Sequence, residues 1–341
     1  MSSLKLMRND HYQMTELLEA LRKAEKIVLF SHISPDGDTV GSALALQLVL
    51  QRLGKTVILV LDGVVPANIS FLLTFGKAMT PVEAAEMDME AAGTLAVAVD
   101  VSCESRMGAA EALFWRAPLT AQVDHHETNP GYAQINLIDG EASATALLVA
   151  RIQHELDVPF EQAEAICLYT ALSTDTGNFL FENTSAEAFG LMQKLMEVGL
   201  PLAKYGRELF MRKQKAFVKL LGKVLPTLTF LCDGKIAGIT LTYQQMCDVD
   251  AKDEHTDGLV NYVIDICGVR MAYFARETAS GAMKVSLRAL SPYRVDDVAA
   301  IFDGGGHHLA AGCTINRPMP EAVQQIEKAL TEALLEGSQQ L

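Results

Sequence analysis

The sequence predicts an α/β protein of two domains, a larger domain with a parallel sheet followed by a smaller domain with a mixed sheet. The chain has 341 residues, half of them hydrophobic, which is more than one ordinary core accommodates. Up to about residue 198, short apolar runs alternate with helical segments, a pattern typical of a parallel sheet. From residue 223 onward, pairs of strand-like runs separated by short turns indicate hairpins.

In the first half, the short apolar runs are the expected strands and the segments of helical spacing are the expected helices. The strands are expected at Lys26–Phe30, Lys55–Leu61, Leu95–Ser102 and Leu119–Asp124. The helices are expected at Thr15–Lys26, Val40–Leu53, Ala142–Leu156, Phe160–Leu172 and Ser185–Val198. Ser185 is the expected N-cap of the last helix and Gly199 its C-cap, with Pro201 beyond.

A charged helical segment, Leu202–Leu221, is expected to connect the two halves. The sequence therefore divides into a first domain at 1–198, a helical linker at 199–222 and a second domain at 223–341. In the second domain, strands are expected at Val224–Cys232, Lys235–Thr242, Val269–Arg276 and Met283–Leu290. Helices are expected at Val295–Phe302, directly after Gly306, and at Pro320–Glu336.

Bulk properties limit the kinds of partner. The net charge of −14 disfavours a protein that grips long nucleic acid, because such binding depends on basic groups that neutralise phosphates. The six cysteines form no CxxC pair, which predicts reduced core thiols in a cytoplasmic protein. The N-terminus has no apolar signal region and no apolar run is long enough to span a membrane, so neither secretion nor a membrane location is expected.

Acidic and imidazole side chains gather where strands or helices of the first domain end. These residues are His32, Asp36 and Asp38 after the first strand, Asp100 after the third, Asp124, His125 and His126 after the fourth, and Asp175 at a helix end. Ligand-binding residues of open α/β sheets collect at the carboxyl ends of the strands. A set of carboxylates and imidazoles without thiolates suits Mn²⁺, Mg²⁺ or Fe²⁺, and several carboxylates together indicate two ions sharing a ligand.

Each of these pieces also has an ordinary structural explanation. Pro-Asp-Gly-Asp is a common turn, and an aspartate after a strand is often the N-cap of the next helix. The two histidines would then be a surface pair. Four such positions in one domain are nevertheless difficult to explain by caps and turns alone.

The second domain carries a possible anion site. Gly304-Gly305-Gly306-His307 precedes an apolar segment that is expected to be a helix, and a helix N-terminus presents N–H groups to anions. Lys284-Val285-Ser286-Leu287-Arg288 lies upstream. An arginine beside such a loop can bind a phosphate through two hydrogen bonds. A flexible turn is the alternative explanation for the glycines.

Together, these motifs resemble the DHH–DHHA1 phosphoesterase family over essentially the whole chain. The matching motifs are His-x-x-Pro-Asp-x-Asp-x-x-Gly-Ser (His32–Ser42), Asp100, Asp124-His125-His126, Thr174-Asp175-Thr176-Gly177, Ser286-Leu287-Arg288 and the Gly-Gly-Gly-His loop. The chain departs from the family where Asp303 stands in place of a frequent glycine.

The resemblance implies a site with two divalent ions, expected to be Mn²⁺. His32, Asp36 and Asp100 would hold one ion, and Asp38, Asp100, His125 and Asp175 the other. Asp124 would orient an imidazole, and His126 would contact the scissile phosphate or donate a proton. The implied substrate contacts are Asn129, Ser286, Arg288, Gly305, Gly306 and His307; Arg106 is a further candidate, equally explained as a surface ion-pair residue.

The implied function is hydrolysis of very short RNA and of 3′-phosphoadenosine 5′-phosphate by a stand-alone family member. A water activated between the ions would attack phosphorus in line. The main alternative is a soluble phosphodiesterase for cyclic or linear dinucleotides such as c-di-AMP, and a non-catalytic nucleotide-binding protein is a weaker alternative. The family also suggests a homodimer, which the residues themselves do not test.

Overall fold

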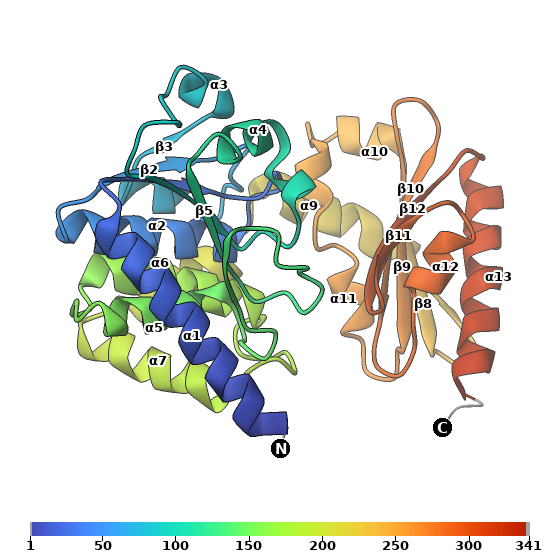
Figure 1. The fold of residues 1–341 in the computed structure, drawn as a ribbon. Coiled ribbons are helices and arrows are strands. Elements are labelled where there is room, and N and C mark those ends of the chain that lie inside the picture. The colour runs from blue at the N-terminus through green and yellow to red at the C-terminus, as the bar shows by residue number, and fades with distance from the viewer. Residues whose placement is uncertain (1, 339–341) are drawn as a thin grey trace. The chain divides into compact units, whose positions relative to one another are not determined.

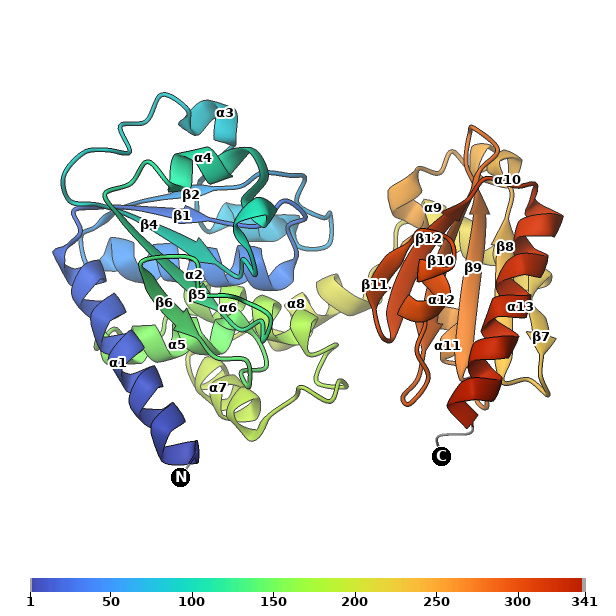
Figure 2. The ribbon, with the colours of Figure 1, turned by 45° about the vertical axis from the view of Figure 1, so that its right-hand side comes forward.

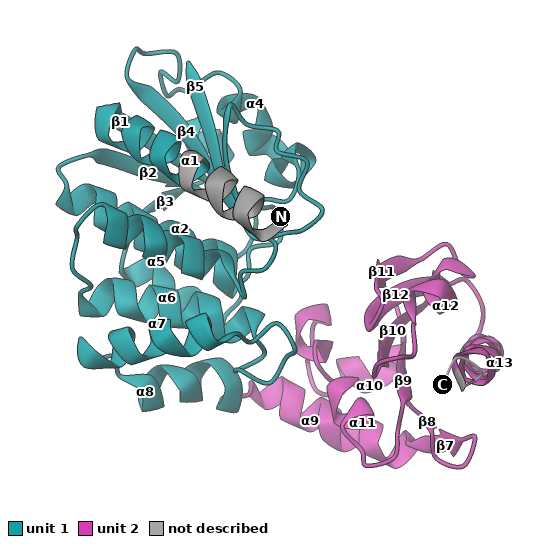
Figure 3. Ribbon diagram, turned by 60° about the horizontal axis from the view of Figure 1, so that its bottom comes forward, with its two compact units in different colours: residues 1–212 teal, residues 213–341 magenta. Residues whose placement is uncertain are grey.

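The computed structural model describes residues 2–338, which form two compact units. The first unit extends to Arg212 and the second begins at Lys213 (Figure 3). The division therefore falls inside the segment that the sequence predicts to be a linker. Each unit has its own sheet and hydrophobic core, and each is described here by itself.

The first unit contains a parallel sheet (Figure 1), and its six strands lie in the order β3-β2-β1-β4-β5-β6. Its strands are β1 (Lys26–Phe30), β2 (Thr56–Val60), β3 (Ala78–Met79), β4 (Thr94–Val99), β5 (Leu119–Asp124) and β6 (Ile135–Ile138). The four predicted strands are confirmed as its centre. The two short edge strands, β3 and β6, were not predicted.

Helices cover both faces of this sheet. On one face, the main core joins the sheet to α1 (Ser2–Lys23), α2 (Gly37–Arg52), α5 (Thr145–Glu155), α6 (Gln162–Asp175) and α7 (Ala186–Glu197). The other face has a smaller core with α3 (Pro81–Ala84), η2 (Glu104–Ala110) and α4 (Glu111–Phe114). A short 3₁₀ helix, η1 (Ser70–Thr74), also belongs to this unit. Ser185 caps α7 as predicted, its side chain accepting from the Ala188 N–H.

The strand order positions the site. The chain runs outward from β1 to β3 on one side and from β4 to β6 on the other, so the connections diverge between β1 and β4. Open parallel sheets bind ligands in the crevice beyond the carboxyl ends of the strands at such a point. The loops after β1 and β4 are those that carry the predicted acidic residues.

The predicted linker helix is not continuous. α8 (Leu202–Gly206) runs into a π-helical turn, η3 (Arg207–Met211), and the chain is extended at Arg212 before α9 (Lys215–Val224). The prediction of one helix is therefore wrong, for a reason of packing. Tyr205 and Leu209 belong to the first core, whereas α9 buries Phe217 in the second, so the helix breaks where its apolar face changes partner.

The second unit contains a six-stranded mixed sheet in the order β11-β12-β10-β9-β8-β7. Its strands are β7 (Thr229–Leu231), β8 (Ile236–Leu241), β9 (Met271–Glu277), β10 (Met283–Ala289), β11 (Gly305–His307) and β12 (Ala310–Ile315). β8 and β9 are parallel and the other neighbours antiparallel, which confirms the mixed sheet and both predicted hairpins.

Each face of the second sheet has its own helices. The C-terminal helix α13 (Met319–Ser338) lies along one face with α12 (Asp296–Ala300), as Figure 2 shows. On the other face, α9 and α11 (Asn261–Ile264) pack over β8 and β9. Two short helices, α10 (Tyr243–Cys247) and η5 (Asp253–Thr256), and the 3₁₀ turn η4 (Leu225–Thr227) complete the unit.

The helix expected after Gly306 does not exist. The glycine segment forms β11, and the apolar residues after it form β12, joined by a tight hairpin. A side chain at Gly306 would approach the backbone oxygen of Ala310 to 2.5 Å, so its glycine permits close strand pairing. The prediction of an anion site at a helix N-terminus is therefore wrong for this segment.

The prediction of core thiols has a mixed outcome. Cys167 and Cys313 are buried as predicted, but Cys247 and Cys267 are exposed, so the prediction of core thiols is wrong for this pair. Among residues 2–338, no helix combines the length and apolar character needed to cross a bilayer.

Candidate active site

The loop after β1 brings His32 and Asp36 together. Nε2 of His32 lies 3.4 Å from Oδ2 of Asp36 and 3.7 Å from Oδ2 of Asp100. The other oxygen of Asp36 accepts the N–H groups of Asp38 and Thr39, so it caps α2. One oxygen of Asp36 therefore caps the helix, as the structural explanation predicts, and the other faces His32, where it could bind an ion.

Asp38 is buried and fixed from three directions. Its Oδ2 accepts the Thr145 N–H at 2.7 Å, and its Oδ1 accepts the Ala146 N–H and the Ser42 hydroxyl. The first N–H groups of α5 thus point at this carboxylate, where the helix dipole favours negative charge. Asp38 has both its position and much of its electrostatic compensation from the start of α5.

Asp100 follows β4 in a left-handed backbone conformation with φ of 61°. Such a conformation is unfavourable for a residue with a side chain and is found preferentially at functional sites. Oδ1 of Asp100 accepts the Thr145 hydroxyl at 2.9 Å. Thr145 therefore contacts two site carboxylates, one through its N–H and one through its hydroxyl.

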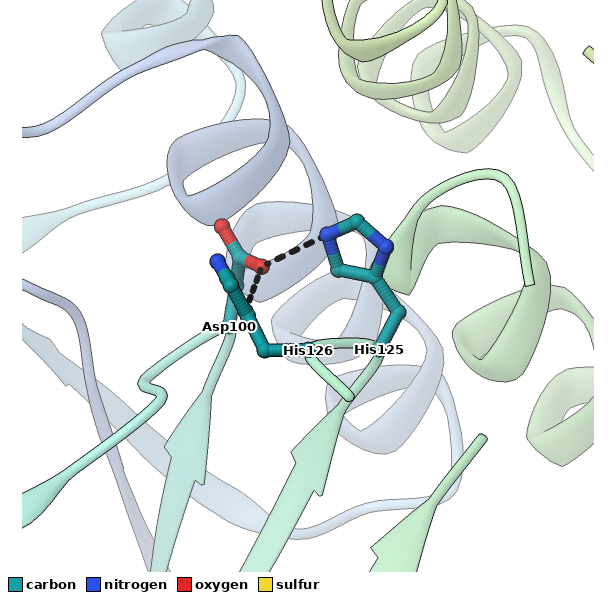
Figure 4. Close-up of side chains that lie close together, drawn as sticks. All are labelled: Asp100, His125 and His126. Carbon is teal, nitrogen blue, oxygen red and sulfur yellow. Dashed lines mark ion pairs between the residues drawn. The ribbon is translucent and has the colours of Figure 1, made fainter. Parts of the chain in front are cut away.

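The two histidines after β5 converge on Asp100. Its Oδ1 lies 3.6 Å from Nε2 of His125 and 3.8 Å from Nδ1 of His126, as Figure 4 shows. Nε2 of His125 is also 3.7 Å from carboxylate oxygens of both Asp38 and Asp175. Nδ1 of His125 lies 3.2 Å from the carbonyl oxygen of Ala142, which orients the ring with Nε2 toward the cluster.

Asp175 reaches the cluster from the end of α6. This helix packs closely on α2, since a side chain at Gly41 would meet the Cys167 carbonyl oxygen at 2.5 Å. Close packing of the two helices brings Asp175 toward Asp38. The Asn183 amide donates to the Asp175 carbonyl and lies 3.5 Å from its carboxylate.

The crowded carboxylates strongly perturb one another. Burial, followed by repulsion from Asp100, Asp175 and Asp36, raises the pKa of Asp38 well above its ordinary value. Burial also raises the pKa of Asp175 to about 6, opposed by His125 and reinforced by Asp100 and Asp36. Burial opposes protonation of His32, but the hydrogen bonds and charges of Asp100 and Asp36 prevail and raise its pKa to about 9.

This cluster fits divalent ions. Potential ligand atoms lie within 4.8 Å of one another in three groups: His32, Asp36 and Asp100; Asp100, His125 and His126; Asp38, His125 and Asp175. Asp100 and His125 each belong to two groups. The donors are all oxygen and nitrogen, which suits Mn²⁺ or Mg²⁺. The raised carboxyl pKa values indicate uncompensated negative charge that bound cations would relieve.

Asp124 and Asn129 lie behind His126. Asp124 is buried, and its Oδ1 is 2.8 Å from Nδ1 of His126. The hydrogen bond with Asp124, opposed by burial, raises the pKa of His126. The Asn129 amide donates to the other Asp124 oxygen, to Gln122 and to the Val101 carbonyl. Asn129 therefore holds Asp124 in place. The sequence analysis, which predicts Asn129 as a substrate contact, missed this role.

Arg106 lies next to the loop after β1 that carries His32. Its carbonyl oxygen accepts the Ile33 N–H at 2.8 Å, and its side chain is exposed. Among residues 13–337, whose side chains the structure describes, this side chain has no ion pair, so the structure gives no support to its explanation as a surface ion-pair residue.

The substrate residues predicted for the second unit lie on neighbouring strands. The register aligns Arg288 with Ala310 and Ala310 with His307, and aligns Ser286 with Gly312 and Gly312 with Gly305. Residues directly opposite in antiparallel strands share a face. Arg288, Ser286 and His307 therefore face the same side of the sheet, where only small residues lie between them.

Asp303 has a simple structural explanation. Its φ is 56°, a left-handed conformation in which glycine is favoured and aspartate is better tolerated than most residues. A glycine at this position, as in the family, would therefore suit the same left-handed backbone conformation. The carboxylate of Asp303 is exposed.

The sequence interpretation missed Thr145. It placed the start of the helix at Ala142, whereas α5 begins at Thr145. A hydroxyl residue immediately before an apolar helical run is the signal that could have identified it.

Comparison with known proteins identifies the domains. The DHH family N-terminal domain matches residues 26–172, and the DHHA1 domain matches residues 238–336. The chain is 31% identical over 326 residues to the bifunctional oligoribonuclease and PAP phosphatase NrnA of Thermus thermophilus, covering 94% of each chain.

Solved structures show the same architecture. An exopolyphosphatase-related protein from Bacteroides fragilis superimposes with a TM-score of 0.86 at 26% identity, covering 94% of this chain and 96% of that one. RecJ of Thermus thermophilus in complex with Mn²⁺ gives a TM-score of 0.52 at 15% identity, covering 94% of this chain and 55% of RecJ. The second likeness is one of fold.

Proposed function

Because this chain belongs to the DHH family and carries a DHHA1 domain, we propose that it hydrolyses short oligoribonucleotides to mononucleotides and 3′-phosphoadenosine 5′-phosphate to AMP. The relative from Thermus thermophilus, 31% identical along nearly the whole chain, bears the name of both activities. The observation that carries the proposal is the convergence of three imidazoles, those of His32, His125 and His126, on the carboxylate of Asp100.

The metal ligands follow from this convergence. One ion would be held by His32, Asp36 and Asp100, and the other by Asp38, Asp100, His125 and Asp175. We propose Mn²⁺, since RecJ, which shares the fold, binds it. When bound, two such ions activate water and neutralise charge on the phosphoryl oxygens.

The protein's own groups supply positioning and a proton. Thr145 and the start of α5 hold Asp38 and Asp100, so the ligands need little rearrangement. We propose that Nδ1–H of His126 donates a hydrogen bond to Asp124, which leaves Nε2 directed away from Asp124. The raised pKa of His126 favours its protonated form. We propose that His126 contacts the scissile phosphate and protonates the departing alcohol.

The second unit would hold the part of the substrate remote from the cleaved bond. Ser286, Arg288 and His307 share one face of its sheet, and exposed glycines at 305 and 306 lie at its edge. The net charge of −14 limits attraction for a long polyanion. Short nucleotides held by a few local cations are therefore the favoured substrates. We place the enzyme in the cytoplasm because its cysteines are all free.

Product analysis tests this function. The purified chain would be given Mn²⁺ with 3′-phosphoadenosine 5′-phosphate, a diribonucleotide, a pentaribonucleotide, cyclic di-AMP and pyrophosphate in parallel. Release of AMP from the first substrate and mononucleotides from the next two supports the proposal. Preference for cyclic di-AMP would assign the enzyme to cyclic-dinucleotide turnover instead. Inactivity toward all five substrates with metal bound would reject hydrolysis of these nucleotides.

A further inference from the structure

A polar cavity of about 340 Å³ lies within the second unit, against the face of the sheet that carries Arg288. Ser286 and Arg288 contribute to its wall. Two other cations, Arg276 of β9 and Lys284 of β10, also line it, opposite one another in the strand register. Neither of them belongs to the motifs that identify the domain.

Asp253 binds the guanidinium of Arg276 through two hydrogen bonds. Its two terminal nitrogens donate to the two oxygens of Asp253, at 2.6 and 3.1 Å. This is the forked geometry by which arginine binds a carboxylate or a phosphate. The Asp253 carboxylate also lies 3.9 Å from Nζ of Lys284, so one anion serves both cations.

The two partners differ sharply in exposure. The side chain of Arg276 is only 8% exposed, whereas that of Asp253 is 68% exposed. Asp253 starts the short helix η5, on the solvent side of the pair. A nearly buried guanidinium is always charged and costs stability if left unpaired. Asp253 can move into water at little cost, but Arg276 then needs another anion.

We propose that Arg276 and Lys284 form a phosphate site in this cavity, and that Asp253 occupies it as an internal anion which a terminal phosphate of the substrate displaces. The proposal rests on the proposed function for the identity of the ligand as a nucleotide. Exchange of one anion for the other keeps Arg276 paired throughout. Arg288, two residues beyond Ser286 on the same face of β10, would contact the nucleotide beside this phosphate.

The site would set substrate preference. Asp257 lines the cavity, and Asp253 pairs with two of its three cations, Arg276 and Lys284, so the free site is only weakly positive. A dianionic phosphate can compete with Asp253 for the paired cations, while a neutral 5′-hydroxyl cannot. Nucleotides with a terminal phosphate at the end held by the second unit would therefore bind more tightly than the same nucleotides without it.

Binding of AMP and of adenosine to the full chain tests the proposal, by calorimetry with Mn²⁺ and again with EDTA. Asp253→Asn removes the competing charge, and we expect AMP to bind about tenfold more tightly, the worth of one charge-assisted hydrogen bond. Adenosine affinity should not change. The side chain of Lys284 is exposed, so Lys284→Gln should not disturb folding. This variant should bind AMP several-fold more weakly, and its affinity for adenosine should not change.

Glu254→Gln is the matched control, because Glu254 is the next carboxylate in η5 and its ion pair is with His255. It should leave both affinities unchanged. The proposal is overturned if Asp253→Asn leaves AMP affinity unchanged or weaker, or if adenosine affinity rises equally. If Asp253→Asn acts as expected while none of the proposed substrates is hydrolysed, the phosphate site stands and the proposed function fails.

Discussion

Nδ1 of His126 lies 2.8 Å from Oδ1 of the buried Asp124. Asp124 can orient the ring and stabilise its protonated form, while Asn129 fixes the carboxylate from behind. The same relationship distinguishes His126 from its neighbour His125, whose Nδ1 faces a backbone carbonyl and whose Nε2 faces three carboxylates. We therefore propose different tasks for the adjacent histidines, proton donation by His126 and metal binding by His125.

Replacing His126 with alanine should lower kcat for a diribonucleotide by about 10²–10⁴-fold, since general acid catalysis is typically worth that much. The loss should be far smaller for a p-nitrophenyl ester of a nucleotide, because p-nitrophenolate leaves without a proton. Comparison of kcat for the two substrates makes the measurement. Equal losses on both esters would show that His126 does not act as the proton donor.

Thr145→Val should weaken Mn²⁺ binding by about 10–100-fold, the usual cost of removing a group that orients a metal ligand. The valine keeps the backbone N–H that reaches Asp38 but loses the hydroxyl that reaches Asp100. Calorimetric titration with Mn²⁺ measures the effect. Thr145→Ser should restore affinity; a serine variant as weak as the valine variant would mean that packing of the methyl group, not the hydroxyl, matters.

Metal should stabilise the first unit. Burial of Asp38 and Asp175 and repulsion from the neighbouring carboxylates, which raise the pKa values of both, oppose folding in the metal-free protein. Mn²⁺ at about a hundred times its dissociation constant should contribute about 2.7 kcal/mol per ion and raise Tm by roughly 5 °C or more. Thermal unfolding with and without EDTA measures the shift. A similar shift in Asp100→Asn would mean that the ions bind elsewhere.

Two neighbouring glycines in β11 should respond differently to alanine. Gly306 has a φ of 148°, and a Cβ there would crowd β12, so Gly306→Ala should cost about 1–3 kcal/mol of stability. A Cβ on Gly305 meets no atom within 4 Å, so Gly305→Ala should leave Tm unchanged and raise KM. Thermal unfolding and steady-state kinetics separate the two. Unchanged KM in Gly305→Ala would exclude this edge of the sheet from substrate binding.

The arrangement of the aspartate and histidine cluster could be predicted from sequence because parallel strands end together. His32, Asp100 and His125 each follow a short apolar run, and three such runs in one sheet must converge. The supporting contacts could not be predicted. Thr145 meets Asp38 across more than one hundred positions of sequence, through a packing of α5 on α2 that no local pattern contains.

The mistaken helix after Gly306 shows a limit of local patterns. Leu-Ala-Ala-Gly after three glycines suits a short helix as well as a strand. Pairing with β10 decides between them, because Leu287 lies opposite Ala311 and both are buried in the core beneath α13. The prediction of one continuous linker helix is wrong for a similar reason. Helical spacing continues through residue 212, but the two ends of the segment pack in different cores.

The most direct test of the two-ion account is the metal content and turnover of the wild-type chain and of Asp100→Ala, measured on the same samples with a diribonucleotide as substrate. The account predicts two Mn²⁺ ions per wild-type chain, turnover that requires both, and loss of turnover in the variant, since we propose Asp100, which lies close to both His32 and His125, as a ligand of both ions. Near-normal turnover by Asp100→Ala, or by the wild-type chain in EDTA, would contradict it.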